Sequence, residues 1–411
     1  MIAFRILFFS HYFLPHVGAA TWSTYYLSLS LSRRGHKIDL IVPNTQYALS
    51  VDDRTAKVLE KEIPIKLHRT PILRIPGKLA PFLSAFFLFF EGLRVGRGAD
   101  VIICQFHPHH FVFVAALFVA KIFRVPVVAR ANDIHREMGR KNLGFMERLI
   151  NVANTFSEYF VKYAQAFLVV DSEGMEILLS RLGKSASNCY IGLSRNGVAL
   201  STFKDAPNKE EARKLLGIDT GDKILLFVGR FSGEEYGIEV LLEAMPNILT
   251  RVPNSILILV GDKMTLHQQK LVNSLKISKN IRVYDPQRHK QIIKFVVAAD
   301  LCIGPLMPTL AIPQKVLEYA ACGKPVVTGT GSVSVDLNPT FNFLVVPPEP
   351  EALSEAFSRV LKDGDYAKLL GSNAKKTVSR FSWERVARDL EGVISQAVKH
   401  YNGKSRGSKQ R

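Results

Sequence analysis

Residues 309–327 read TLAIPQKVLEYAACGKPVV, a short helical pattern followed directly by a strand-like run. Pro313 suits the first position of a helix, and Gly323 with Pro325 is typical of a helix end, so we expect a helix over 313–321. Residues 326–328, Val-Val-Thr, then predict a buried strand. Such helix–strand units build doubly wound sheets, which bind ligands in the loops at the ends of their strands.

Two charged residues lie three positions apart on this expected helix, Lys315 and Glu318, and therefore share one face. A cation near the start of a helix is locally unfavourable, which suggests that Lys315 faces an anion. A carboxylate three residues later can accept hydrogen bonds from ribose hydroxyls. The segment by itself is equally consistent with a capped surface helix that carries a solvated ion pair.

The same alternation of strand-like and helix-length segments extends outward in both directions. Strand-like runs are found at residues 6–9, 38–42, 101–104, 125–129, 167–170, 224–228, 256–260, 281–284, 301–303, 325–328 and 343–346. The pattern predicts an α/β protein with two facing Rossmann-like, doubly wound domains and an interdomain cleft, where ligands commonly bind. The loop after residues 6–9 lacks the G-x-G-x-x-G spacing, which disfavours a nicotinamide enzyme.

The length of 411 residues exceeds what a single hydrophobic core usually supports. A polar stretch over 196–210 is the best linker candidate, so we expect an N-terminal acceptor domain at 1–199 and a donor domain at 200–382. Residues 383–398 have helical periodicity and are expected to pack back on the N-terminal domain. Residues 399–411 are basic and are expected to form a disordered tail.

The formal net charge of +18 is spread over both halves of the chain. It is compatible with anionic lipid or phosphorylated substrates, while the absence of zinc-finger spacing and of RNP-like aromatic patterns argues against nucleic acid. Four cysteines without paired spacing predict buried thiols in a reducing compartment. The apolar run near the start is too short for a signal peptide, so we expect a cytoplasmic protein.

Two apolar runs, residues 79–90 and 111–120, are too short to span a membrane. Lys78, Arg94 and Arg97 flank the first run, which allows a helix lying in the bilayer interface on the inner face of the membrane. Two buried core helices explain the same runs equally well.

Arg230 follows the strand-like run 224–228 and Gly229, which places it at the end of a strand. Its planar guanidinium matches a diphosphate bidentately, and the glycine leaves room for close approach. The alternative is a surface arginine paired with Glu234 or Glu235.

Taken together, these segments resemble the retaining, nucleotide-sugar-dependent glycosyltransferases of GT-B fold, family four (group 1 type). The resemblance covers nearly the whole chain. The matching segments are residues 15–18 (P-x-x-G), 34–38 (RGHKI), 195–198 (RNGV) with Phe203, 228–230 (VGR) and 318–326 (EYAACGKPV).

The resemblance implies roles for the matching residues. Arg230 would neutralise the donor diphosphate, Glu318 would bind the ribose hydroxyls, and Gly18 would present its backbone N–H to phosphate or sugar. Lys315 matches the lysine of a subgroup with the motif P-x-K-x-x-E-Y, and Asn196 belongs to the donor-side interdomain segment. The family needs no metal or other cofactor, because protein cations and a helix N-terminus stabilise the leaving diphosphate.

Three positions depart from the family pattern. The family commonly has a lysine shortly after the strand-end arginine, and this chain has Tyr236 and one extra residue there, so that Lys315 or Lys263 would have to substitute. The usual E-x7-E pair is halved, because Leu310 stands at the position of its first acid.

The third departure lies in the first domain, where the family's His-Asp pair is Asn132-Asp133, with His135 two residues on. We take Asn132, Asp133 and His107 as the catalytic candidates. His107, His109 and His110 also suggest metal ligands, but adjacent histidines point in different directions and no carboxylate is near, so no metal site is expected.

The sequence therefore predicts transfer of a sugar, with retention, from a nucleotide diphosphate sugar to a glycan or lipid-linked acceptor hydroxyl. Contact with an anionic membrane is an additional expectation. Two alternatives stay open: a GT-B protein that binds nucleotide without transferring sugar, as a regulatory or scaffold subunit, and a sugar-nucleotide epimerase. The altered positions Leu310, Tyr236 and Asn132 motivate the first of these alternatives.

Overall fold

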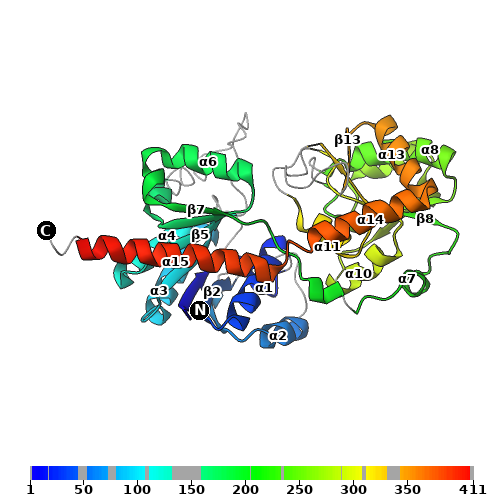
Figure 1. The fold of residues 1–411 in the computed structure, drawn as a ribbon. Coiled ribbons are helices and arrows are strands. Elements are labelled where there is room, and N and C mark those ends of the chain that lie inside the picture. The colour runs from blue at the N-terminus through cyan, green and yellow to red at the C-terminus, as the bar shows by residue number, and fades with distance from the viewer. Residues whose placement is uncertain are drawn as a thin grey trace. The chain divides into compact units, whose positions relative to one another are not determined.

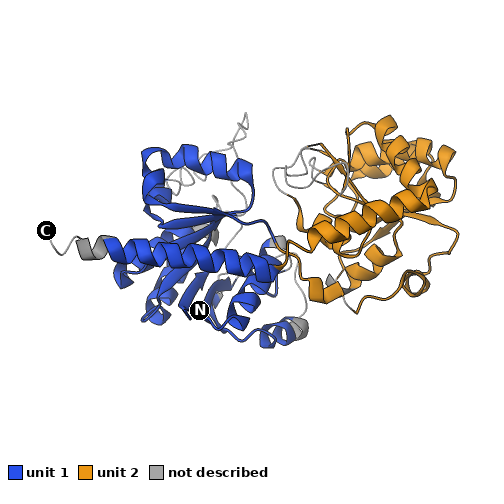
Figure 2. Cartoon of the chain, viewed as in Figure 1, with its two compact units in different colours: residues 1–196, 383–411 blue, residues 197–382 orange. Residues whose placement is uncertain are grey.

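The computed structural model describes residues 2–16, 18–44, 53–72, 80–106, 111–131, 159–203, 205–232, 236–287, 289–307, 312–330 and 343–407. The chain forms two compact units (Figures 1 and 2). The first combines Met1–Asn196 with Trp383–Arg411, and the second is Gly197–Ser382. Each unit is built on a parallel sheet with helices, which confirms the expected α/β class.

The sheet of the first unit has seven described strands in the order β3-β2-β1-β4-β5-β6-β7. They are β1 (Arg5–Phe9), β2 (Lys37–Asn44), β3 (Lys66–Ile72), β4 (Val101–Phe106), β5 (Val127–Ala131), β6 (Ala166–Val169) and β7 (Tyr190–Leu193). The described helices are α1 (Ala19–Arg33), α2 (Asp53–Lys61), α3 (Ala80–Val95), α4 (Val112–Phe123), α6 (Ser172–Leu182) and α15 (Trp383–Gly407), with 3-10 turns η1 (Phe160–Tyr163) and η2 (Gly183–Asn188). The central strand β1 pairs with β2 and β4, and its last four residues are buried.

The last helix of the chain, α15, belongs to the first unit and packs on α1 and on strands β5 to β7. Arg34 and His36 both bind the carboxylate of Glu391, with His36 Nε2 lying 2.9 Å from Glu391 Oε1. Ser194 Oγ donates to Asp389 Oδ2 at 2.7 Å. The expected disordered tail from residue 399 needs a correction, because α15 continues to Gly407. The continuation contains no proline that would end the helix, and its Tyr401 lines a pocket of the first unit.

The second unit has six described strands in the order β10-β9-β8-β11-β12-β13. They are β8 (Lys223–Gly229), β9 (Ser255–Gly261), β10 (Ile281–Tyr284), β11 (Leu301–Ile303), β12 (Val326–Gly329) and β13 (Leu344–Val346). Its described helices are α7 (Lys209–Leu216), α8 (Ile238–Arg251), α9 (Leu266–Ser274), α10 (His289–Ala298), α11 (Gln314–Ala321), α13 (Pro350–Lys362) and α14 (Gly364–Val378), with η3 (Leu200–Phe203) and η5 (Ser278–Asn280).

Strand β8 shows why this sheet is covered on both faces. Its residues alternate between two cores: Ile224 and Leu226 belong to one cluster, and Leu225 and Phe227 to the other. Because successive side chains of a strand point to opposite faces, a continuous apolar run requires helices on both sides. This is the doubly wound arrangement that the strand-like runs predicted.

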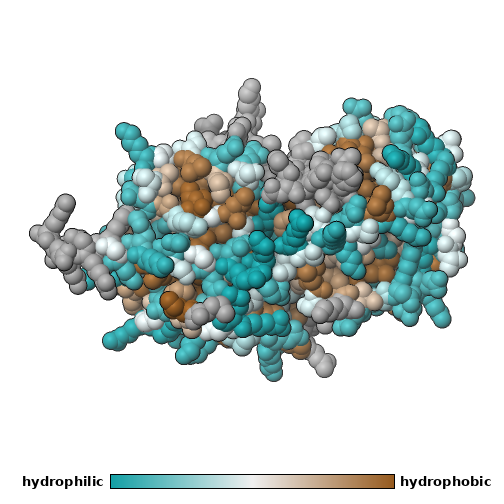
Figure 3. Space-filling model, in the orientation of Figure 1, coloured by the Kyte–Doolittle hydropathy of each residue, from teal (hydrophilic) through white to brown (hydrophobic). Residues whose placement is uncertain are grey.

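None of the helices among the described residues is long and apolar enough to cross a membrane. The two apolar runs form α3 and α4, which pack against each other. Each buries one side: Leu88 is buried in α3, whereas Phe86 and Phe90 are exposed. On the face of the molecule in Figure 3, apolar side chains gather in small patches among polar ones.

Candidate functional site

Helix α11 carries the two charged residues of the opening segment. It spans Gln314–Ala321, with Pro313 as its N-cap and Cys322 as its C-cap, so the predicted helix is correct to within one residue at its start. Pro313 therefore precedes the helix instead of occupying its first position. The apolar side of α11 is buried, which leaves Lys315 and Glu318 on the less buried side.

Tyr319 fixes α11 against the end of β8. Its ring is fully buried, and its hydroxyl oxygen accepts a hydrogen bond from the Val228 N–H at 2.9 Å. Burial raises the pKa of Tyr319 well above its ordinary value, so the hydroxyl stays protonated. The tyrosine of the EYAACGKPV segment is thus a structural link that brings the Lys315 turn to the end of β8.

Lys315 lies against the end of that strand. Its Nζ is 3.9 Å from the centroid of the Phe227 ring and 4.3 Å from that of Tyr236, both within cation–π range. Gly229 makes this approach possible, because a Cβ built there would lie 2.9 Å from Lys315 Nζ. The φ of +143° at Gly229 also favours glycine.

The structure thereby gives the altered position Tyr236 a specific surrounding. Where the family commonly has a lysine, this chain has an aromatic ring that contacts the ammonium group of Lys315. The cation at this strand end is therefore Lys315 of α11, and the Tyr236 ring contacts it where it lies next to Gly229. Lys263, the other residue considered as a substitute, is exposed in the loop after β9.

Arg230 comes directly after Gly229 and is exposed at the carboxyl end of β8. Glu318 is half-buried on α11, one turn after Lys315. Leu310 and the alternative partners Glu234 and Glu235 lie outside the described residues. The structure thus assembles Arg230 and Lys315 at one strand end, with Glu318 on the adjoining helix.

The loop that follows Arg230 is held by polar side chains that the sequence did not single out. The Phe231 N–H donates to Asp262 Oδ1 at 2.5 Å, and Gln268 Nε2 donates to the Phe231 carbonyl at 2.7 Å. Gln268 also donates to Glu239 Oε1 at 2.8 Å. One signal in the sequence could have pointed to Asp262. It follows Gly261 at the end of β9, just as Arg230 follows Gly229 at the end of β8.

In the first unit, Gly18 is the N-cap of α1 and has an extended backbone, with φ 178°. Any residue adopts that conformation, so the reason for a glycine is space: a Cβ there would lie 3.1 Å from His16 Nε2. The first turn of α1 contains no acidic residue. Gly18 therefore marks a helix N-terminus without a side-chain cap or an acid in its first turn, which is a favourable electrostatic environment for an anion.

A buried polar network lies behind this helix start and was not predicted. Ser10 Oγ is 3.0 Å from Thr24 Oγ1 and donates to Gln105 Oε1 at 3.2 Å, while Gln105 Nε2 donates to Thr24. The network therefore links the carboxyl ends of β1 and β4 to helix α1.

Asn196 is held inside the first unit by Arg130, a fully buried arginine of β5. Arg130 Nη2 donates to Asn196 Oδ1 at 2.9 Å, and Nη1 donates to Ser23. The guanidinium also lies 5.4 Å from the ring centroid of Trp383. The contacts of Asn196 are thus structural, and its expected donor contact stays a prediction.

The catalytic candidates His107, Asn132 and Asp133 lie outside the described residues, as do His109, His110 and His135. Among the residues that the structure describes, no group of three or more metal-ligating side chains is found. All four cysteines are free; Cys104 and Cys302 are buried as expected, whereas Cys189 and Cys322 are only partly buried. Burial raises the pKa of Cys322 to about 12, so its thiol is not activated.

Comparison with known families gives a match in the second unit. Residues 208–377 match the family model described as "Glycosyl transferases group 1". The matched region includes Arg230, Lys315 and Glu318.

Similar proteins extend the likeness to most of the chain. An uncharacterized glycosyltransferase of Methanocaldococcus jannaschii is 27% identical over 308 residues, which is 73% of this chain and 76% of that protein. A D-inositol 3-phosphate glycosyltransferase of Corynebacterium diphtheriae is 28% identical over 340 residues, 79% of this chain and 76% of that protein.

Among solved structures, Anabaena HepE in complex with UDP and glucose has a TM-score of 0.73 at 18% identity, and the match covers 95% of this chain and 99% of that one. At this identity, the likeness concerns the fold. It is the fold of the GT-B glycosyltransferases.

Proposed function

We propose that this chain, whose residues 208–377 match the family model of group 1 glycosyl transferases, transfers a sugar from a nucleotide diphosphate sugar to an acceptor hydroxyl with retention of anomeric configuration. The donor class is supported by HepE, which was solved with UDP and glucose and with UDP-glucose. The strand-end cluster of this chain supplies the independent chemical argument.

The observation that carries the proposal is the packing of Lys315 at the end of β8. Nζ lies over Gly229, and Arg230 is the next residue in the chain. Two cations lie beside Gly229, which has no side chain and so leaves space at the strand end. This arrangement suits a diphosphate, which needs both positive charge and close approach.

In the proposed reaction, the bond from the anomeric carbon to the diphosphate oxygen breaks, and its electron pair leaves with the nucleoside diphosphate. Arg230 and Lys315 stabilise the negative charge that develops on that oxygen. A new bond forms from the acceptor oxygen to the anomeric carbon on the same face, and the acceptor hydroxyl loses its proton. Glu318 accepts hydrogen bonds from the ribose hydroxyls.

We assign the acceptor side of the reaction to the first unit. His107, Asn132 and Asp133 are the residues proposed for acceptor placement and catalysis. Gly18, at the N-terminus of α1, is assigned to donor binding, where its backbone N–H would meet the phosphate or sugar. Asn196 is proposed to contact the donor. These assignments rest on the family motifs.

We further propose that the acceptor is a glycan or a lipid-linked molecule. The protein would then bind peripherally to the inner face of a membrane. The support is physical: the chain carries a net charge of +18, and α3 exposes Phe86 and Phe90. Cations together with exposed aromatic side chains suit an anionic bilayer surface.

Nucleotide release from a panel of UDP-, GDP- and ADP-sugars tests the donor site. We expect Arg230→Ala, Lys315→Ala and Glu318→Ala each to lower kcat/KM on the preferred donor by roughly a hundredfold, the loss typical of removing one charge-stabilising group. Arg359→Ala is the matched control, because Arg359 is exposed on α13 of the same unit. Activity that is unaffected in all three variants would refute the assignment.

The same panel distinguishes the two alternative functions. Nucleotide binding without turnover on any donor would favour a regulatory or scaffold protein, which the changes at Tyr236, Leu310 and Asn132 would then explain. Interconversion of donors in the absence of any acceptor would favour an epimerase.

A further inference from the structure

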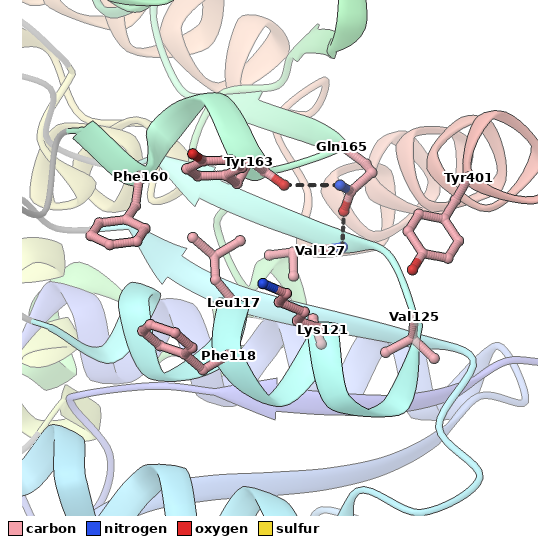
Figure 4. A pocket seen from close by; sticks show the side chains of 10 residues that line it. Leu117, Phe118, Lys121, Val125, Val127, Phe160, Tyr163, Gln165 and Tyr401 are labelled. Carbon is pink, nitrogen blue, oxygen red and sulfur yellow. Dashed lines mark hydrogen bonds between the residues drawn. The ribbon is translucent and has the colours of Figure 1, made fainter. Parts of the chain in front are cut away.

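The first unit contains a pocket that the proposed reaction does not use. This pocket of about 370 Å³ lies between α4, η1 and the last turns of α15. Its lining is mainly apolar and aromatic (Figure 4), with Leu117, Phe118, Ala120, Lys121, Val125, Val127, Phe160, Tyr163, Gln165 and Tyr401 around it. The volume is within the usual range of ligand pockets, about 300–1,000 Å³.

The pocket lies at the amino-terminal edge of the sheet. Val125 and Val127 stand at the start of β5, and Gln165 directly precedes β6. The carboxyl end of β5 at Ala131 lies roughly 13 Å from Val127 at about 3.3 Å per residue, and Asn132 and Asp133 come after it in the sequence. The pocket is therefore a separate site.

Some polar groups of the pocket form hydrogen bonds with the backbone, and others point into the pocket. The Gln165 side chain binds the backbone on both sides: its Oε1 accepts from the Val127 N–H at 2.7 Å, and its Nε2 donates to the Tyr163 carbonyl at 2.8 Å. Lys121 reaches from α4 towards the middle of the pocket, while Phe160 and Tyr401 lie on opposite sides (Figure 4).

The rim of the pocket exposes large apolar side chains. Phe118 and Tyr163 of the lining are 47% and 49% exposed, and Tyr159, whose ring contacts those of Phe160 and Tyr163, is 58% exposed. Lys162 Nζ lies 3.6 Å from the ring centroid of Tyr159, which places a cation on the aromatic rim. Half-exposed aromatic rings mixed with lysines are typical of surfaces at a membrane interface.

The charges on the elements that form the pocket are of one sign. Neither α4 nor η1 contains an acidic residue, and both contain a lysine. The part of α15 from Gly392 onward is likewise without acids and carries Lys399. Glu158, the acid nearest to η1 in sequence, lies outside the described residues. The surface is thus complementary to an anionic partner.

We propose that this pocket and its rim bind an anionic lipid bilayer, with the pocket taking up the apolar chain of a lipid and Lys121 and Lys162 contacting the headgroups. A soluble anion would use the lysines but not the apolar hollow or the exposed rings. The inference deepens the membrane contact proposed above, but it concerns vesicle binding alone and does not depend on sugar transfer.

Flotation of the full chain with phosphatidylcholine vesicles, with and without phosphatidylglycerol, tests the binding. We expect flotation only with phosphatidylglycerol, weakened at high salt. The double variant Phe118→Ser with Lys121→Glu should bind at least tenfold more weakly. The matched control is Leu369→Ser with Lys368→Glu on α14, which removes an exposed apolar residue and a lysine from the second unit and should bind like the wild type.

Insertion is tested with Phe118→Trp and vesicles whose acyl chains carry bromine. Tryptophan emission should be quenched beyond the level of the wild type, whose own tryptophans are Trp22 and Trp383. Equal weakening in both double variants would show a mere effect of net charge and overturn the proposal. Absent flotation, or flotation without added quenching, would overturn it as well. Neither assay contains a donor, so these failures leave the test of sugar transfer untouched.

Discussion

At the scale of single residues, the second unit shows how one altered position changes a neighbour's surroundings. Tyr236 stands where the family commonly has a lysine, and its ring lies against the ammonium group of Lys315. Phe227 contacts the same group at 3.9 Å. Two aromatic faces restrict where Lys315 points, which lowers the entropy that a bound diphosphate must overcome.

Substitutions at Tyr236 test this positioning role. Tyr236→Leu should lower kcat/KM for nucleotide release by roughly two- to thirtyfold, the equivalent of a cation–π contact of about 0.5–2 kcal/mol. Tyr236→Phe keeps the ring and should stay near wild-type activity. Tyr366→Leu, which removes the ring contacting Arg359 in the same unit, serves as the control. Equal losses for Phe and Leu would argue that the hydroxyl matters and the ring does not.

Lys324 shows that a conspicuous motif residue can be structural. In the Gly-Lys-Pro segment its Nζ donates to the carbonyls of Val297 and Ala299, the latter at 2.8 Å, and so caps the end of α10. Burial lowers the pKa of Lys324. The lysine of this motif therefore holds a helix end, while Lys315 faces the strand end.

At the scale of elements, the Arg-Gly-His segment anchors the last helix. Glu391 of α15 binds Arg34 and His36, and the Phe4 N–H donates to the other ring nitrogen of His36 at 3.1 Å. Burial alone would raise the pKa of Glu391, but the hydrogen bonds from Arg34 and His36 outweigh it and hold the pKa below its ordinary value.

This lowered pKa predicts a pH-dependent stability. A carboxyl whose folded pKa is depressed stabilises the fold above its unfolded pKa of about 4.3, and this contribution is lost as pH falls through the folded value. Glu391→Gln should therefore cost about 1–3 kcal/mol at pH 7, where charge-assisted hydrogen bonds are lost, and less at pH 4 and below. Thermal unfolding of the wild type and of Glu391→Gln at several pH values measures this difference in stability.

An exposed ion pair in the other unit provides the comparison for Glu391. Glu351 binds Arg251 and is 58% exposed in its side chain, so Glu351→Gln should change stability by less than about 1 kcal/mol. If Glu391→Gln showed no greater effect than Glu351→Gln, the anchoring role would be wrong.

At the scale of the whole molecule, the end of the chain completes the first unit. Trp383, Leu390, Val393, Ile394 and Ala397 of α15 are buried there. Gly192 of β7 accommodates this packing, because a Cβ there would lie 2.8 Å from Val393. Each large side chain contributes roughly 1.5–3 kcal/mol on burial, so the helix contributes about as much as the total stability of a typical domain, 5–15 kcal/mol.

Truncation tests this dependence. A chain that ends at Ser382 should expose residues 1–196 to limited proteolysis, while 197–382, which contains its own two cores, should stay resistant. A chain that ends at Gly403 keeps Tyr401 and should resist as the full protein does. Resistance of residues 1–196 in the shorter chain would show that the first unit folds without α15.

The strands that the sequence failed to predict are the two edges of the first sheet. β3 contains Lys66, His68 and Pro71, and β7 has no fully buried residue. Central strands such as β1 and β4 contain unbroken apolar runs, residues 6–9 and 101–104, and these runs were predicted. Periodicity reports burial, so an edge strand that is half in solvent leaves little signal.

The sequence by itself determined two α/β domains, the helix at α11, and Lys315 with Glu318 on one side of it, because helix stops and apolar runs act between near neighbours. Only the tertiary structure brought Lys315 onto Gly229 and Tyr236, residues about eighty positions earlier, through the packing of α11 on β8. It also decided that α15 continues to Gly407. Contacts between distant segments depend on register and side-chain volume, which no local pattern in the chain records.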